Sequence, residues 1–345
     1  MPLLSRRQAL LTAIAAAAGT AWRPGRAQPL SPAMGPTRPT GLRFAVPVPT
    51  PFSPTLELDL AAHRQLLAFY RRAGATAVLA VAASGEMLSI SWPEALQLSR
   101  QARQVFGTEC TWASVSRGSS VQSCLAGIRE LRAAGVGLPV VVPGLLAGEE
   151  LSEEEALARL MAVAQGAAGP LGLYEAIAPY HRILCPEALA RLSRSGAYQL
   201  LKTTQGAAAA VSALLQATGG ALRIYEANSA DLAEVLTAGA SGVLNVSAAV
   251  FPELVAALMK GWGDPARSEQ LRRLCGWIGS SDTQFQTALS FPRGIKAALA
   301  LRGLPITALS RQAVADLSGD QQAAVTELVR QFRGWCRDLA VTPLV

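Results

Sequence analysis

The sequence predicts an α/β protein: a closed (β/α)8 barrel of the TIM type with a C-terminal helical extension. Three observations support this prediction. From Gly41 onward, short β-prone apolar runs alternate with longer amphipathic stretches, eight such runs occur, and beyond about Pro252 only helix-like segments remain. Eight strands that are each followed by a helix make up a closed parallel barrel, whose active site lies at the carboxyl ends of the strands.

The predicted elements follow one another in regular order. The strands are expected at 42–48, 77–82, 111–116, 139–145, 172–177, 198–203, 222–227 and 242–246. Helices are expected between them at 60–73, 92–105, 121–134, 152–168, 186–193, 207–217 and 229–238, and many are followed by glycine, a usual helix stop. The barrel is expected to span 41–265. The extension, 266–345, follows a first helix at 252–259 and is expected to hold helices at 267–276, 285–301 and 321–339.

The first 27 residues resemble an export signal of the twin-arginine type. Arg6-Arg7 precedes an apolar stretch from Ala9 to about Trp22, and small residues follow before Gln28. Residues 28–40 are rich in Pro, Ser and Gly and are expected to be a disordered leader. The mature domain is therefore expected in the periplasm. An uncleaved membrane tether is the alternative, although the stretch is shorter than the about 20 residues of a comfortable span.

Composition excludes several classes of function. The net charge of +7 comes from isolated arginines rather than from a basic stripe with interleaved aromatics, which argues against a nucleic-acid partner. Two histidines exclude a His-rich metal site, and no glycine-rich phosphate loop is present, so neither a metal nor a cofactor is expected. The cysteines form no Cys-x-x-Cys pair and are interpreted as buried thiols: Cys110, Cys124, Cys185, Cys275 and Cys336.

Lys202 is the first candidate for chemistry. The chain contains 31 basic residues, and only Lys202, Lys260 and Lys296 among them are lysines. Lys202 lies in an apolar run that reads as a buried strand, where an ammonium group is costly. A desolvated lysine can lose its proton and attack a carbonyl carbon, whereas arginine cannot. We therefore interpret Lys202 as a nucleophile. The alternative is a strand-end lysine whose amine reaches solvent, and a solvated or helix-end role is expected for Lys260 and Lys296.

Tyr174 is the second candidate. Formation of a Schiff base needs a group that moves protons beside the amine. Tyr174 lies in the predicted fifth strand, one strand before Lys202, so neighbouring strand ends could bring the phenol near the amine. A tyrosine in a strand is also common core material, and the pairing with Lys202 favours the catalytic interpretation.

These residues resemble the dihydrodipicolinate synthase and N-acetylneuraminate lyase family of Schiff-base aldolases and dehydratases, over nearly all of residues 41–345. Tyr174 and Lys202 match the family's catalytic tyrosine and lysine, and their separation of 28 positions agrees with it. The segment Ala83-Ser84-Gly85-Glu86 corresponds to the loop that holds the carboxylate of a 2-oxo acid. The resemblance implies this role for Ser84 and Gly85, and fixed backbone dipoles with a hydroxyl suit an anion.

Further segments match the family as well. Gly242-Val-Leu-Asn-Val246 corresponds to the eighth strand, where the backbone at Leu244 would line the pocket for the pyruvyl group. The opening Pro47-Val-Pro-Thr-Pro-Phe52 and the helical tail also correspond. The resemblance implies a homo-oligomer, a tetramer or a dimer.

Departures from the family argue against the reaction of lysine biosynthesis. In dihydrodipicolinate synthase itself, the enzyme of that reaction, a threonine and a second tyrosine from the adjacent subunit complete a proton relay. Here Ala83 and Leu145 occupy those positions. The arginine that follows the catalytic tyrosine in that enzyme is replaced by the spaced motif Pro179-Tyr-His-Arg182.

Four other residues are candidates for the rest of the site. His181 and Arg182 either bind a distal carboxylate or hydroxyl of the substrate or form a structural salt bridge in their loop. Glu175 and Glu226 would lie near strand ends, and either could replace the missing relay. Because adjacent strand residues face opposite sides, Glu175 must point away if Tyr174 points inward, and Glu226 is the better candidate.

The sequence therefore predicts a lyase, either an aldolase or a dehydratase, that acts on a 2-oxo acid such as pyruvate or a sugar-derived keto acid. Lys202 forms the imine, Ser84 and Gly85 hold the carboxylate, and Tyr174 moves protons. The alternative is an exported, non-catalytic protein that binds or senses 2-oxo acids on the same scaffold. No nucleic-acid partner and no stable membrane span are expected.

Overall fold

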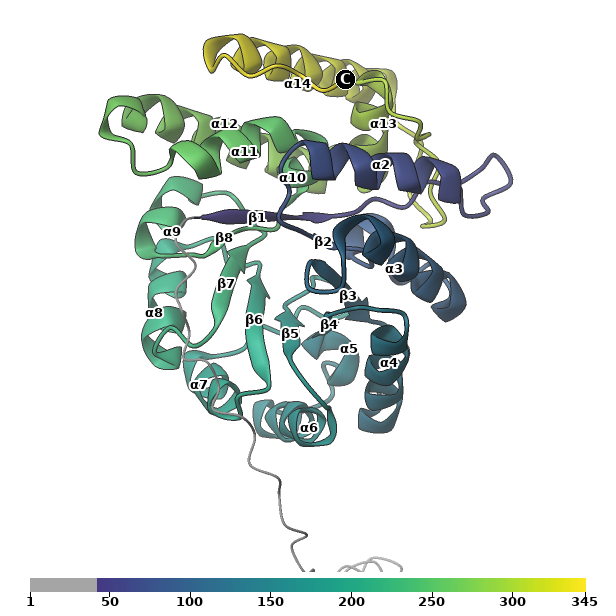
Figure 1. The fold of residues 1–345 in the computed structure, drawn as a ribbon, viewed down its shortest axis with the longest axis vertical. Helices are drawn as coiled ribbons and strands as arrows, with labels where there is room; N and C mark the ends of the chain where they lie inside the picture. Colours follow the sequence, from purple (N-terminus) through teal and green to yellow (C-terminus); the bar gives the residue numbers. More distant parts are fainter. Residues whose placement is uncertain (1–41) are drawn as a thin grey trace, which may run out of the picture. The chain divides into compact units, whose positions relative to one another are not determined.

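Eight short parallel strands pair in chain order and close on one another, so that β1 contacts both β2 and β8. The computed structural model describes residues 42–345. The strands are β1 (Arg43–Pro47), β2 (Ala77–Leu79), β3 (Thr111–Val115), β4 (Leu138–Val141), β5 (Leu171–Tyr174), β6 (Tyr198–Thr203), β7 (Arg223–Glu226) and β8 (Gly242–Val243). This closed sheet confirms the predicted (β/α)8 barrel (Figure 1).

Helices follow the strands and surround the sheet. They are α2 (Leu60–Arg72), α3 (Trp92–Phe106), α4 (Val121–Ala133), α6 (Glu153–Gly166), α7 (Pro186–Arg194), α8 (Ala208–Thr218) and α9 (Leu232–Ala238). The local sequence defines their starts: Ser91 with Glu94, and Ser152 with Glu155, form capping boxes at α3 and α6. Every residue of β3, β4 and β5 is buried, because the barrel interior covers one face of the sheet and the helices cover the other.

Short helical turns occupy the carboxyl ends of three strands. They are the 3-10 turn η1 (Ala83–Gly85) after β2, α5 (Pro143–Leu146) after β4 and α10 (Val246–Val250) after β8. The predicted strand at 139–145 is therefore too long, since Pro143 begins α5 and proline favours the first turn of a helix.

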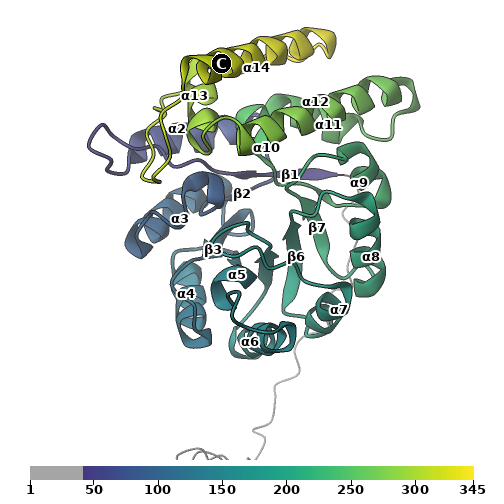
Figure 2. The ribbon, with the colours of Figure 1, turned by 180° about the vertical axis from the view of Figure 1, so that it is seen from behind.

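The C-terminal helices are α11 (Pro252–Gly261), η2 (Pro265–Arg267), α12 (Ser268–Thr287), α13 (Arg293–Leu301) and α14 (Gly319–Asp338). Helices α11 to α14 lie on the side of the barrel that carries β1 and α2 (Figure 1 and Figure 2). The predicted single helix at 285–301 is wrong. Pro292 cannot continue a helix, so α12 ends at Thr287 and a turn separates it from α13.

The barrel and the C-terminal helices belong to one compact unit. Phe251 contributes to the joint between them, because its ring stacks on Phe332 of α14 with 5.2 Å between the ring centroids. The predicted boundary at 265/266 stays a prediction. The expected export signal (1–27) and leader (28–40) lie outside the described residues. Within 42–345, no helix combines the length and apolarity required to cross a bilayer.

Candidate active site

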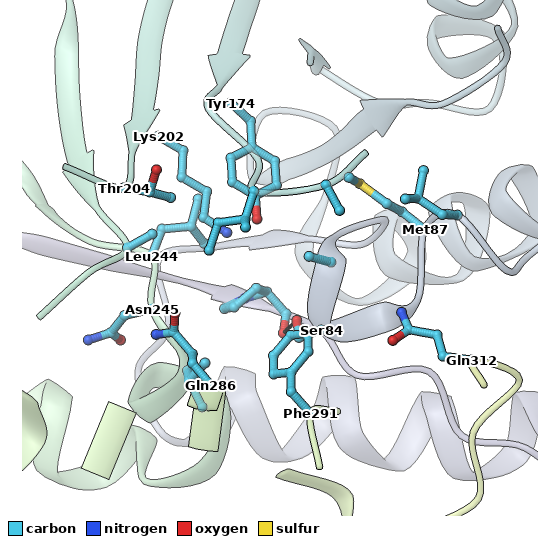
Figure 3. Close-up of a pocket in the computed structure, with 17 residues that line it drawn as sticks. Ser84, Met87, Tyr174, Lys202, Thr204, Leu244, Asn245, Gln286, Phe291 and Gln312 are labelled. Atoms are coloured by element: carbon cyan, nitrogen blue, oxygen red, sulfur yellow. Dashed lines mark hydrogen bonds between the residues drawn. The ribbon is translucent and has the colours of Figure 1, made fainter. Parts of the chain in front are cut away.

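A cavity of about 260 Å³ lies at the carboxyl ends of the strands, where the active site of such barrels is expected. Lys202 and Tyr174 enter it from one side, and Gln286, Phe291 and Gln312 enter from the other (Figure 3). Backbone or side-chain atoms of Pro47, Ala83, Ser84, Met87, Leu88, Ile177, Ala178, Thr204, Ala227, Leu244, Asn245 and Val246 complete the lining. The cavity therefore combines strand ends, the turn η1 and the C-terminal helices.

Lys202 lies on β6 directly beside Tyr174 on β5. The two residues are partners in the strand register, so both side chains point to the barrel interior. Lys202 is only 4% exposed, and its Nζ lies 3.9 Å from the centroid of the Tyr174 ring. Burial lowers the pKa of the Lys202 amine to about 7, and the negative charge of Glu226 opposes this change. A large fraction of the amine is thus neutral near physiological pH.

Tyr174 directs its hydroxyl into the same space as the lysine amine (Figure 3). The ring is buried, and burial raises the pKa of the phenol above its usual value. The phenol therefore keeps its proton at neutral pH and is available as a hydrogen-bond donor and a proton donor. Ala83 lines the cavity without a hydroxyl, and Leu145 of α5 is not among the lining residues.

The turn η1 places Ser84 across the cavity from Lys202 (Figure 3). The Ser84 hydroxyl donates to the carbonyl oxygen of Pro47 at 2.8 Å and keeps its lone pairs for a further donor. Among the described residues, the backbone N–H groups of Ala83 and Ser84 have no hydrogen-bond partner. Two free amides at one turn can hold a carboxylate, whereas the Ser84 hydroxyl would have to leave Pro47 O to donate to it.

Gly85 lies behind this turn rather than on the cavity wall. Its N–H donates to Ala82 O, and its carbonyl accepts from the Thr50 hydroxyl at 2.7 Å. A Cβ atom here would lie 2.5 Å from Val48 O, so only glycine fits. The expected role of Gly85 in binding the carboxylate is therefore corrected: its amide is already used, and the free donors belong to Ala83 and Ser84.

A buried ion pair ties the turn to the C-terminal helices. Lys296 on α13 donates from Nζ to Glu86 and to Leu309 O, and both charged side chains are 0% exposed. The other carboxylate oxygen of Glu86 accepts from the Ser310 hydroxyl and from the backbone N–H groups of Arg311 and Gln312. The expectation of a solvated Lys296 is wrong, because its side chain is buried. The local sequence does not reveal the pairing, because Glu86 lies 210 positions away. Lys260, by contrast, is exposed.

Leu244 and Asn245 form the wall at the end of β8. The Leu244 N–H donates to Glu226 O at 2.8 Å, so its backbone is held in place while it lines the cavity. Asn245 caps α10 through Ala248 N and donates to the Ser229 hydroxyl at 2.7 Å.

Both glutamates point away from the cavity. Lys202 and Tyr225 are register partners that face inward, so Thr203 and Glu226 face the opposite side of the sheet. The Glu226 Oε1 accepts from Ala227 N and Asn228 N, and burial raises the pKa of this carboxyl to about 8. Glu175 accepts from Leu184 N and from the Thr203 hydroxyl. The alternation that excluded Glu175 therefore also excludes Glu226 from the cavity wall.

Neither His181 nor Arg182 lines the cavity. His181 is exposed, and its Nε2 lies 2.7 Å from the Thr204 hydroxyl. The Arg182 guanidinium is buried and donates to Ala147 O, Gly148 O and Leu151 O and to the Glu153 carboxylate. For Arg182 the structure therefore favours the second alternative, a structural salt bridge, because its donors hold the chain after α5.

Sequence reasoning missed the lining residues outside the strands, above all Gln286, Phe291 and Gln312. Nothing in their local sequence marks them as site residues, because α12, the turn before α13 and the segment after it reach the cavity only through tertiary packing. Pro292 was the one available signal, since it showed that a turn interrupts the predicted helix. His63, expected at the surface or in packing, is buried beside Gln101.

Comparison with known proteins gives one consistent result. The model of the Dihydrodipicolinate synthetase family matches residues 41–332. The 4-hydroxy-tetrahydrodipicolinate synthase of Synechococcus sp. (strain CC9605) is 28% identical over 295 residues, which cover 84% of this chain and 95% of that protein.

Solved structures show the same fold. YagE, a prophage protein of E. coli described as belonging to the dihydrodipicolinic acid synthase family and solved in complex with pyruvate, superposes with a TM-score of 0.77 at 20% identity. The match covers 85% of this chain and 98% of that chain. The 4-hydroxy-tetrahydrodipicolinate synthase of Methylacidiphilum fumariolicum gives a TM-score of 0.77 at 21% identity, over 87% of this chain and 98% of that one.

Proposed function

This chain belongs to the dihydrodipicolinate synthetase family, and from that premise we propose that it is a lyase that forms a Schiff base with a 2-oxo acid. The substrate class is pyruvate or a sugar-derived keto acid. One observation carries the proposal: the buried Lys202 amine, with a pKa near 7, lies against the Tyr174 ring in a cavity at the strand ends.

The chemistry begins with attack of the neutral Lys202 Nζ on the keto carbon. A C–N bond forms, and one proton moves from the nitrogen through the Tyr174 hydroxyl to the carbonyl oxygen, which becomes the hydroxyl of a carbinolamine. The Tyr174 hydroxyl donates a proton to that oxygen as it leaves as water, and a protonated imine remains. The imine nitrogen withdraws electrons from the neighbouring bond, which permits aldol cleavage, condensation or loss of water. Aldolase and dehydratase therefore remain alternatives.

The turn that contains Ser84 supplies the complementary binding site. The free N–H groups of Ala83 and Ser84 can bind an anion without placing a second cation near the amine. A cation at this turn would hold the carboxylate tightly, but it would also lower the pKa of Lys202 further. Fixed backbone dipoles bind the carboxylate without adding a charge, so burial remains the main cause of the lowered pKa of Lys202.

Trapping with borohydride tests the proposal directly. The protein is incubated with pyruvate and borohydride, and the reduced adduct is mapped to a peptide by mass spectrometry. We expect the adduct on Lys202 and not on Lys260 or Lys296, and we expect none in Lys202→Arg. Absence of an adduct in the unsubstituted protein would remove the Schiff-base function.

Substitution of Tyr174 tests the proton donor. Tyr174→Phe keeps the ring that packs against Lys202 and removes only the hydroxyl. We expect the rate of adduct formation to fall by about 100-fold or more, the usual contribution of a positioned acid or base, while the thermal unfolding midpoint changes little. An unchanged rate would show that another group moves the proton.

A non-catalytic binding protein is the second candidate. Ala83 and Leu145 stand where the family relay has hydroxyl groups, which favours this alternative. An adduct on Lys202 without turnover of any tested 2-oxo acid or aldol product would support it, and turnover would exclude it.

We also propose that the mature protein is periplasmic, exported through the signal at residues 1–27, and that it forms a homo-oligomer, a tetramer or a dimer. The twin arginines support the first proposal, and family membership supports the second.

A further inference from the structure

We propose that the cavity selects substrates whose distal end carries no charge, and that the side-chain amides of Gln286 and Gln312 bind that end. This inference rests on the proposed Schiff-base function, since it describes the part of the same cavity beyond the 2-oxo acid group. It assigns a specificity role to two residues of the C-terminal segment.

Among the described residues, Lys202 is the only Lys, Arg or His that lines the cavity, and no Asp or Glu of residues 42–345 lines it. The Lys202 charge is located at the imine, so it is not available to a second anionic group further along the substrate. Any distal carboxylate or phosphate would therefore enter without a counter-charge.

The arginines of the neighbouring segments are already committed. Arg182 donates to three carbonyl groups and Glu153. Arg293 forms an ion pair with Asp316 at 2.7 Å, and Arg311 forms a bidentate ion pair with Glu94 at 2.8 and 2.9 Å. None of the three lines the cavity, so recruiting one would break an existing ion pair.

Gln286 and Gln312 offer unused hydrogen-bonding groups instead. Within 42–345, neither side-chain amide has a hydrogen-bond partner, although both line the cavity. Their backbones are fixed: Gln286 lies in the last turn of α12, and the Gln312 N–H donates to the buried Glu86 carboxylate. Figure 3 shows both side chains on the wall opposite Lys202 and Tyr174, with Phe291 between them. An amide both donates and accepts, so it suits hydroxyl, carbonyl or ester groups.

Four apolar side chains also line the cavity: Met87, Leu88, Ile177 and Phe291. The amide of Asn245 already bonds to the Ser229 hydroxyl and to Ala248 N. Such a surface gives little compensation to a desolvated anion, whereas a neutral polar group that finds a hydrogen bond is tolerated. The predicted discrimination between two ligands that differ only in distal charge is at least tenfold.

A matched pair of 2-oxo acids tests this preference. 2-Oxoglutarate and its 5-methyl ester share the group that reacts with Lys202 and differ in the charge of the distal end. The half-saturating concentration for borohydride trapping on Lys202 is measured for each, with pyruvate as the reference. We expect the value for the ester to be at least tenfold lower than the value for the dicarboxylate. Equal values, a lower value for the dicarboxylate, or no trapping of either compound while pyruvate is trapped would overturn the inference.

Substitutions then identify the residues. Gln286→Arg and Gln312→Arg place a cation on the distal wall and are expected to shift the ester-to-dicarboxylate ratio at least tenfold toward the dicarboxylate. Gln284→Arg is the matched control: this residue also lies on α12 but outside the cavity, and the ratio should stay unchanged. If the first two variants behave like the control, the assignment to these residues is wrong. If the unsubstituted protein does not trap pyruvate, the proposed Schiff-base function itself is contradicted.

Discussion

The lowered pKa of Lys202 comes from desolvation rather than from a neighbouring positive charge. Burial in the barrel mouth disfavours the ammonium form, and the Tyr174 ring covers one side of the amine. Lys296 is buried as well, but it donates to Glu86 and to a backbone carbonyl. The two buried lysines therefore differ in their hydrogen bonds: the Lys296 ammonium donates to a carboxylate, and the Lys202 amine does not.

The pKa of Lys202 predicts the pH dependence of imine formation. The reactive species is the neutral amine, and burial lowers the pKa to about 7, so the rate should rise with pH and level off above about 8. At one pH unit below the midpoint, about one-tenth of the amine is neutral. The initial rate of borohydride trapping with pyruvate, measured across this range, checks the prediction. A midpoint near the ordinary lysine value would contradict it.

At the residue scale, the sequence was informative where composition was unusual. Lysine is so rare that Lys202 in an apolar strand stood out, and its separation from Tyr174 matched the family pattern. The partners of Arg182 and Lys296 could not be foreseen, because they come from backbone carbonyls and from a carboxylate far away in the chain. Glu226 was misjudged because the alternation rule, applied correctly to Glu175, was not applied to it as well.

At the scale of elements, the Glu86–Lys296 pair links the turn that faces the substrate to α13 and the segment after it. Breaking a buried pair by removing one partner leaves an uncompensated charge and costs about 3 kcal/mol or more. Here three further donors surround the second oxygen of Glu86, so the carboxylate is held from two sides.

Lys296→Met should therefore lower the free energy of unfolding by about 3 kcal/mol, measured by urea denaturation. The variant should also raise the half-saturating pyruvate concentration, because the turn carrying Ser84 loses its support. Glu86→Gln combined with Lys296→Met should be less destabilising than the sum of the two single changes. Simple additivity would indicate that the two groups do not interact.

Arg182 offers a contrasting test, because its contacts hold the chain after α5 and not the cavity. Arg182→Ala removes the hydrogen bonds of the guanidinium, leaves Ala147 O and Leu151 O without a donor and should lower the free energy of unfolding by about 3 kcal/mol. The half-saturating pyruvate concentration of the folded variant should stay within about threefold of the original value, a small free-energy change. A rise of tenfold or more would restore the interpretation of Arg182 as a substrate ligand.

The order and type of the elements followed from local sequence, since apolar strand runs alternate with amphipathic stretches and glycine stops end many helices. The errors arose at the strand ends and in the tail. Residues 143–146 and 83–85 turn into short helical segments after brief strands, and the segment containing Pro292 turns between α12 and α13. Two of these irregular segments line the cavity, through Ala83, Ser84 and Phe291. Local periodicity was therefore least informative in segments that form the candidate site.

At the scale of the whole molecule, export can be tested separately from catalysis. Arg6→Lys together with Arg7→Lys preserves charge but removes the twin-arginine pair. In a bacterial host with this export system, we expect the mature protein in the periplasmic fraction and the variant in the cytoplasmic fraction, detected by immunoblotting. A periplasmic variant would show that another signal directs export.

The cavity is assembled from two separate parts of the chain. The strand ends and η1 carry the amine, the phenol and the carboxylate cradle, whereas α12, the turn before α13 and the segment at Gln312 supply the opposite wall. Changes in the tail can therefore retune which molecule is accepted while the reacting groups stay intact.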